Sequence, residues 1–299
     1  KFCMFLVCSF TLVTIFNLFA LQAKAEWAVS MKELLNGLSF GFPEVSAAEE
    51  AKGKSPLGTA LATFGIIGVG AAELIAYPYW CLEKGYGKYI GPQQENESWL
   101  KRAKGWMKVM QFDAWGSMLV YTFCTLAFYL LGAAILGRAG MVPEGSEMIR
   151  TLSVMYEPVF GKSAQTVFLI GAFAVLFSTF YVAIAAQSRL FVDVISLLGF
   201  TNKPDESTRM KRVKICNVLF AVVSLLFFLF ISKPVLLVLI SGVMQALMLP
   251  LLGASVLYFR YRKTDRRLLP GGLWDVMLWV SFACFAVIGV YLLVTKLGG

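Results

Sequence analysis

The chain has 299 residues, of which 58% are hydrophobic and 15% are charged, and its mean hydropathy is +0.71. Soluble domains are about a quarter charged, so this composition excludes an ordinary soluble protein and predicts an all-α, polytopic transmembrane helix bundle with the lipid bilayer as its main partner. The net charge is +9, but the basic residues stand at the ends of apolar runs without interleaved aromatic residues, which argues against a nucleic-acid partner.

A membrane-spanning helix needs about 20 mostly apolar residues. Residues 1–299 are predicted to form a single transmembrane domain in which seven segments meet this requirement: 1–23, 57–82, 109–137, 164–198, 213–232, 234–258 and 273–295. Residues 1–25 have a second interpretation, because a lysine, an apolar run and Ala23-Lys24-Ala25 before Glu26 are also typical of a cleaved signal peptide.

Two further segments need separate interpretation. Residues 26–56 are predicted to form an outer loop with a short amphipathic interfacial helix. Segment 164–198 is too long for one upright span, so we expect its helix to continue beyond Arg189 into the interface.

The distribution of Lys and Arg predicts the orientation. If the loops alternate, 82–108, 199–214 and 259–272 share one side and carry sixteen basic residues against six acids, whereas the other side carries nine against eight. The first side is therefore predicted to be cytoplasmic. The C-terminus is predicted to lie outside the cell inner (cytoplasmic) membrane.

Segment 57–82 combines glycines, a proline and a carboxylate within one predicted crossing. Gly68, Gly70 and Pro78 weaken a helix, and Glu73 is the only acid deep within any predicted span. A charge at that depth usually lines a pathway or finds a partner, and secondary transporters place their ions at broken helices. The structural alternative is that the glycines are packing contacts and Glu73 is a protonated, hydrogen-bonded core residue.

The segment 235–253 holds a second polar centre at Gln245 and a second proline, Pro250. Gln245 is predicted either to offer its amide oxygen to a cation, to offer its amino group to Glu73, or to make a structural hydrogen bond between helices. Histidine is absent, and the sequence has no Gly-x-Ser-x-Gly, HExxH or phosphate-loop motif, so catalysis has little support and no enzymatic activity is predicted.

At these two segments the sequence resembles the Nramp family of divalent-metal transporters, whose fold is the inverted-repeat fold of LeuT-type transporters. The resemblance rests on Gly68-Val-Gly-Ala-Ala-Glu-Leu-Ile-Ala-Tyr-Pro-Tyr-Trp80 and on Ser241-Gly-Val-Met-Gln-Ala-Leu-Met-Leu-Pro-Leu-Leu-Gly-Ala-Ser-Val-Leu-Tyr-Phe259. The resemblance aligns the chain with the family's fifth to eleventh spans and so implies a partial LeuT-type fold. Within the family, the sequence is similar to a divergent bacterial branch. The family's first unwound helix, with its Asp-Pro-Gly-Asn ligands, would lie upstream of Lys1, so the resemblance implies that further N-terminal spans complete the site.

The departures from the family motif concern the metal ligands. Alignment by the glycine places Ala72 at the family's metal-binding methionine, and alignment by Pro78 places Tyr77 there; in both cases the thioether is lost. A carboxylate with amide and carbonyl oxygens favours harder ions such as Mg²⁺, Ca²⁺ or Mn²⁺. The family's histidine is also missing.

The resemblance and the residues together predict a secondary active transporter of a divalent cation of the Mn, Mg or Fe type, working by alternating access. Glu73 and Gln245 are the predicted metal ligands, with Ala72 and Tyr77 beside them, and Gly68, Gly70 and Pro78 would expose backbone carbonyls. The cation is substrate, no resident cofactor is expected, and H⁺ or Na⁺ is the expected coupling ion. The alternatives are a Na⁺- or H⁺-coupled transporter of an amino acid or other organic solute with the same broad fold, and an intramembrane enzyme or scaffold.

Overall fold

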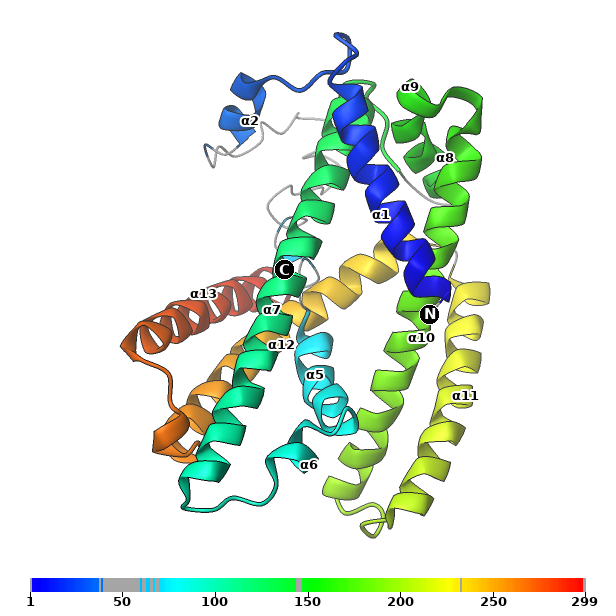
Figure 1. Ribbon diagram of the computed structural model, residues 1–299. Coiled ribbons are helices and arrows are strands. Elements are labelled where there is room, and N and C mark those ends of the chain that lie inside the picture. Colours follow the sequence, from blue (N-terminus) through cyan, green and yellow to red (C-terminus); the bar gives the residue numbers. More distant parts are fainter. Residues whose placement is uncertain are drawn as a thin grey trace. The chain divides into compact units, whose positions relative to one another are not determined.

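The computed structural model describes residues 2–37, 39, 60, 63–64, 67, 70–143, 147–231 and 233–297, which form helices and no strand (Figure 1). The all-α prediction is therefore confirmed for this part of the chain. The main helices are α1 (Phe2–Leu21), α2 (Met31–Gly37), α5 (Ala71–Glu83), α6 (Tyr86–Ile90), α7 (Glu97–Leu131), α8 (Met148–Ser153), α9 (Glu157–Phe160), α10 (Ala164–Leu197), α11 (Glu206–Phe230), α12 (Pro234–Arg262) and α13 (Gly272–Leu297). Short helices of other types are η1 (Gly132–Gly137), η3 (Val154–Tyr156), η4 (Gly161–Ser163) and η5 (Arg266–Leu268).

The helical segments have the length and composition of membrane spans. Among the described residues, five are long and apolar enough to cross a bilayer: Glu97–Gly137, Met148–Leu197, Glu206–Phe230, Val235–Arg262 and Gly272–Val294. Phe5–Leu21 is a shorter apolar helix. Large apolar side chains such as Phe228 and Phe230 are 71% and 82% exposed. Lipid rather than water must cover an apolar surface of this kind. The chain is an integral membrane protein.

The described helices do not begin and end where the apolar runs do, and a helix can be longer or shorter than its run. The apolar run predicted at 109–137 belongs to a helix that begins at Glu97, twelve residues earlier. The run at 57–82 overlaps the 13-residue helix α5, which ends one residue beyond it at Glu83. The helix from Ala164 continues unbroken past Arg189 to Leu197, as predicted. Polar residues extend a helix as readily as apolar ones, so hydropathy marks the lipid-compatible part and not the helix end.

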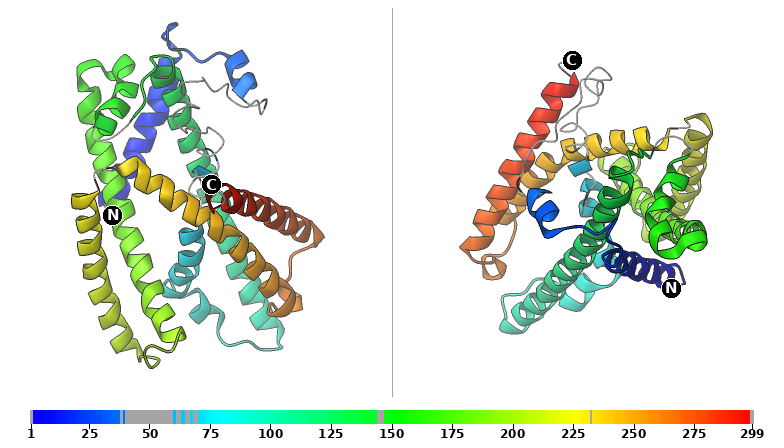
Figure 2. Two further views of the ribbon diagram at one scale, coloured as in Figure 1. Left: turned by 180° about the vertical axis from the view of Figure 1, so that it is seen from behind. Right: turned by 90° about the horizontal axis from the view of Figure 1, so that it is seen from above.

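The chain divides into two compact units, unit 1 (residues 1–41 and 120–235) and unit 2 (residues 42–119 and 236–299). In unit 1, α10 packs along α11 and along α1, and Figure 2 shows α10 and α11 side by side. The Phe10 ring lies where a Cβ on Gly171 would stand, so only glycine lets α1 approach α10 this closely.

The core of unit 1 also buries polar side chains of α1. The Thr14 hydroxyl lies 2.7 Å from the Tyr156 hydroxyl, and the Asn17 amide donates to the Met155 carbonyl at 3.0 Å. Both Thr14 and Asn17 are at most 1% exposed. Because buried polar groups need partners, these bonds fix α1 against η3.

Two carboxylates close to span ends pair with arginines. In unit 1, Arg209 of α11 donates two hydrogen bonds of 2.9 Å to Asp193 of α10. In unit 2, Arg260 of α12 donates to Asp275 of α13 at 2.6 and 2.9 Å. Each two-bond pair joins consecutive helices at their loop end.

The helix predicted within the outer loop is α2. Ser30 and Glu33 cap its start reciprocally: the Ser30 N–H donates to the Glu33 carboxylate at 2.7 Å and the Glu33 N–H to the Ser30 hydroxyl at 3.2 Å. Arg138 then joins the loop through Glu33 at 2.8 Å and through the carbonyls of Glu26 and Ala28 at 3.0 Å each. The interfacial location of α2 stays a prediction.

Candidate functional site

The candidate site lies in unit 2, where α5 begins. Gly70 precedes the helix with extended backbone angles of φ −69° and ψ 168°. The first N–H groups of a helix have no partner within it, and glycine has no side chain to cap them. Gln245 of α12 supplies the missing acceptor, because the Ala72 N–H donates to its Oε1 at 3.3 Å.

Glu73 completes the arrangement from the first turn of α5. A Cβ on Gly70 would come within 2.6 Å of Glu73 Oε2 and closer still to Gln245 Oε1. A carboxylate oxygen and an amide oxygen therefore converge on the same point, and they do so because residue 70 carries only hydrogen there. We call this group of Gly70, Ala72, Glu73 and Gln245 the α5 oxygen cluster.

The orientation of Gln245 is fixed from its own helix. Its Nε2 donates to the Ser241 hydroxyl at 3.3 Å, one turn earlier on α12. The amino group of Gln245 is thus directed to Ser241 and not to Glu73, and the amide oxygen faces α5. Ser241 was not singled out by sequence, although its position four residues before Gln245 places both on one face of a helix.

A comparison with protein families matches residues 85–295 to the Nramp model, described as natural resistance-associated macrophage protein-like. The match covers more than half of the chain. The chain belongs to the Nramp family. Comparisons with curated proteins and with solved structures gave no match.

Nramp membership implies transport of divalent metal ions, and the family is one of transporters. The matched residues include Ser241 and Gln245 but begin at Gly85, so Gly70, Glu73 and Tyr77 precede them. Gly70, Ala72 and Glu73 of the α5 oxygen cluster therefore lie outside the matched residues.

Electrostatics at the start of α5 favour negative charge. The N-terminus of a helix carries about half a positive elementary charge, and Glu73 in the first turn offsets it. The sequence suggested a deeply buried carboxylate, but the Glu73 side chain is exposed. An exposed carboxylate at this position can approach a cation.

The ligand count of this Nramp chain is incomplete in the described residues. Glu73 and Gln245 offer three side-chain oxygens, whereas Mg²⁺ takes six ligands and Ca²⁺ six to eight. Nowhere in the part of the chain that the structure describes do three His, Cys, Asp or Glu side chains gather as a metal centre. A cation held here would need further oxygens from backbone carbonyls, water or other segments.

The remaining predicted residues have different positions. Tyr77 lies one turn after Glu73, and its hydroxyl is buried without a hydrogen-bond partner in the described structure. Pro78 lies inside α5, which continues through it; because proline has no N–H, the Leu74 carbonyl lacks its usual helical donor. The structure shows α5 beginning directly after Gly70, and Gly68 lies outside the described residues.

Proposed function

We propose that this Nramp chain is the transport domain of a secondary active transporter that moves a divalent metal cation of the Mn, Mg or Fe type by alternating access. The proposal places it in the cytoplasmic membrane, with H⁺ or Na⁺ as coupling ion and the C-terminus outside, as the distribution of Lys and Arg favours. The observation that carries it beyond family membership is the convergence of the Glu73 and Gln245 oxygens at Gly70.

Glu73 is the charged ligand in this proposal. Its carboxylate offsets the positive end of α5 and leaves a second oxygen for a cation. Divalent cations of the hard class bind carboxylate and amide oxygens, and Glu73 supplies the negative charge that draws a cation to a site the helix dipole would otherwise disfavour.

Gln245 is the neutral ligand. A carbonyl-type oxygen has two lone pairs, of which the Ala72 N–H occupies one. The second can bind the cation while α12 stays joined to α5, or the cation can replace the N–H altogether. Replacement would release α12 from α5 when the ion binds, which couples occupancy to helix movement as alternating access requires.

The choice of cation follows from the ligand atoms. No thioether or imidazole stands at Ala72, Glu73 or Gln245, and oxygen ligands favour Mn²⁺ and Mg²⁺ over softer ions. We therefore propose that Mn²⁺ or Mg²⁺ is taken up in preference to Fe²⁺.

The test is uptake by proteoliposomes that contain the full-length protein, measured for Mn²⁺, Mg²⁺, Fe²⁺ and a panel of amino acids. Glu73→Gln keeps the size of the side chain and removes its charge, and we expect it to abolish cation uptake. Glu157→Gln makes the same chemical change at an exposed residue outside the α5 oxygen cluster and should leave uptake intact.

Cation uptake that is lost in Glu73→Gln and kept in Glu157→Gln would support the proposal. Amino-acid uptake without cation uptake would overturn it in favour of an organic-solute transporter. Cation uptake unchanged by Glu73→Gln would remove Glu73 from the site.

A further inference from the structure

The first three turns of α7, residues 97–108, have two unlike faces. One face packs within unit 2: Trp99 and Ala103 are buried, and the Trp106 ring stacks on Tyr89 with centroids 5.3 Å apart. Arg102 is held on this part of the helix by its hydrogen bond to the Ile90 carbonyl at 3.1 Å. These contacts hold the start of α7 in place.

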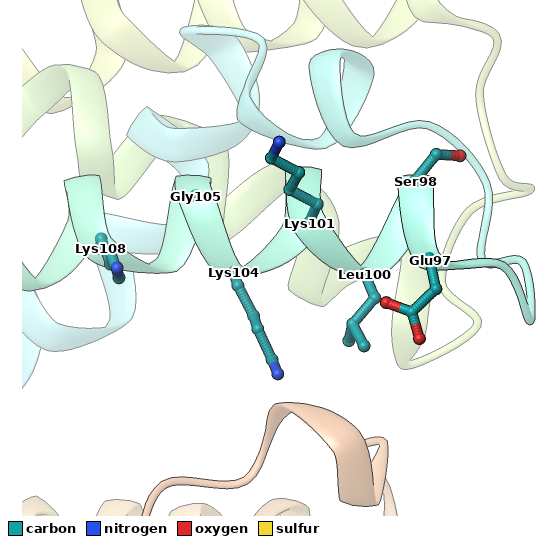
Figure 3. A pocket seen from close by; sticks show the side chains of 7 residues that line it. All are labelled: Glu97, Ser98, Leu100, Lys101, Lys104, Gly105 and Lys108. Atoms are coloured by element: carbon teal, nitrogen blue, oxygen red, sulfur yellow. The ribbon is translucent and has the colours of Figure 1, made fainter.

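The other face carries lysines. Lys101, Lys104 and Lys108 are exposed and, with Leu100 and Gly105, line an open hollow of about 700 Å³ (Figure 3). We call Lys101, Lys104 and Lys108 the lysine face. In the described structure no ion pair engages any of its members. The acid among the lining residues is Glu97, at the first turn of the helix.

The lysine face stands where α7 enters the membrane. A 35-residue helix is about 52 Å long at 1.5 Å per residue, whereas the hydrocarbon core is about 30 Å thick. The apolar run begins at residue 109, directly after Lys108. The first turns of α7 therefore lie at the level of the lipid headgroups, with Trp99 and Trp106 as aromatic residues of the same level.

We propose that the lysine face binds the phosphate of an anionic phospholipid headgroup from the bilayer that α7 enters. Three cations without acidic partners form a site for a multiply oxygenated anion. Figure 3 shows their side chains directed to different sides of the helix, but each has a flexible four-carbon stem, and positions 101, 104 and 108 fall on one helical face. The ammonium groups can therefore converge on one headgroup while its acyl chains run beside the apolar part of α7.

The position of the lysine face beside a membrane-spanning helix favours a lipid headgroup over free phosphate. Clusters of basic residues directly beside a membrane-spanning helix attract anionic lipids, at about 1 kcal/mol for each Lys or Arg near the surface. An energy of this size raises the binding affinity about fivefold for each lysine. A free phosphate would gain the charge contacts but not the apolar contact with the rest of α7.

The experiment measures lipid binding by the full-length protein in detergent micelles doped with phosphatidylglycerol or, in a parallel series, phosphatidylcholine. Bound lipid is counted by native mass spectrometry and affinity by titration. In the triple variant Lys101→Gln, Lys104→Gln, Lys108→Gln we expect at least tenfold weaker phosphatidylglycerol binding and no change for phosphatidylcholine.

The matched control is the triple variant Lys203→Gln, Lys211→Gln, Lys214→Gln, which removes the same charge from loop 199–214 and α11 on the same predicted side of the membrane. It should keep phosphatidylglycerol binding within about twofold. Equal weakening by both triple variants would show a general charge effect and overturn the proposal. Inorganic phosphate that displaces the lipid at millimolar concentration would also overturn it, because the site would then hold the free ion as well as it holds the headgroup.

Discussion

Gly70→Ala tests the α5 oxygen cluster directly. The backbone angles at Gly70 lie in the extended region that any residue adopts, so the added methyl group causes no backbone strain. It would instead occupy the point on which Gln245 Oε1 and Glu73 Oε2 converge. Both are ends of flexible side chains, so they will turn away and the fold will persist.

The two expected effects differ in size. Stability loses the hydrogen bond between Ala72 and Gln245, about 0.5–1.5 kcal/mol, and regains part of it because alanine restricts the unfolded chain by about 0.4–1 kcal/mol. The net change is under about 1 kcal/mol. For the contact between a cation and a charged oxygen we take the scale of a hydrogen bond to a charged group, about 1.5–3 kcal/mol. Uptake should therefore lose about 10- to 150-fold in apparent affinity.

The assay pairs Mn²⁺ uptake by proteoliposomes with thermal unfolding of the same preparations. Gly116→Ala is the control, because a Cβ there meets nothing within 4 Å among the described atoms; it should stabilise α7 by about 1 kcal/mol and leave uptake unchanged. Full uptake by a folded Gly70→Ala protein would refute the assignment of Glu73 and Gln245 as ligands.

Three further outcomes follow from other contacts. Gln245→Glu keeps an acceptor for the Ala72 N–H and adds a second carboxylate beside Glu73, so it should raise the apparent Mn²⁺ affinity in concentration-dependent uptake. Gln245→Leu should lower that affinity. Equal losses of affinity in both variants would contradict the ligand role of Gln245. The Ser30 N–H and hydroxyl, with Arg138, lower the pKa of Glu33 from 4.5 to about 2, so its contribution to holding α2 is complete above pH 4.5 and is lost as the pH falls toward 2. Hydrogen exchange of residues 26–37 should show this loss, and Glu33→Gln should abolish its pH dependence. Arg209→Gln breaks the two-bond pair with Asp193, in which the side chains are 20% and 28% exposed. It should lower the free energy of unfolding, measured by chemical denaturation, by about 1.5–3 kcal/mol. The control Glu206→Gln removes a 3.7 Å contact of a carboxylate that is 78% exposed and should change the free energy of unfolding by under about 1 kcal/mol.

The sequence can predict a long apolar helix because lipid selects its composition. The run 164–198 corresponds to α10 at Ala164–Leu197 almost residue for residue. Hydropathy does not predict a helix end where the helix continues in water. α11 begins at Glu206, seven residues before the predicted 213, because the Asp205 side chain accepts from the Thr208 N–H and caps the start. A cap of this kind is a local signal that a hydropathy count does not include.

The sequence singles out Glu73 and Gln245, but it does not indicate the contacts that they make. Glu73 and Gln245 stand out as rare polar residues in apolar segments, and both belong to the α5 oxygen cluster. The partner of Gln245, the backbone N–H of Ala72, has no signature in side-chain identity. The exposure of Glu73 also escapes sequence reasoning, because it depends on which helices cover α5 and not on the depth at which the residue is counted.

The pair of Arg260 and Asp275 has a consequence for biogenesis. α13 carries a carboxylate in its first turn, at the edge of the predicted span, and a charge that moves into the bilayer without a partner is costly. Arg260 at the end of α12 neutralises that carboxylate, and only nine residues separate the two helices. The two helices can therefore insert as one hairpin whose loop end carries a neutralised pair of charges.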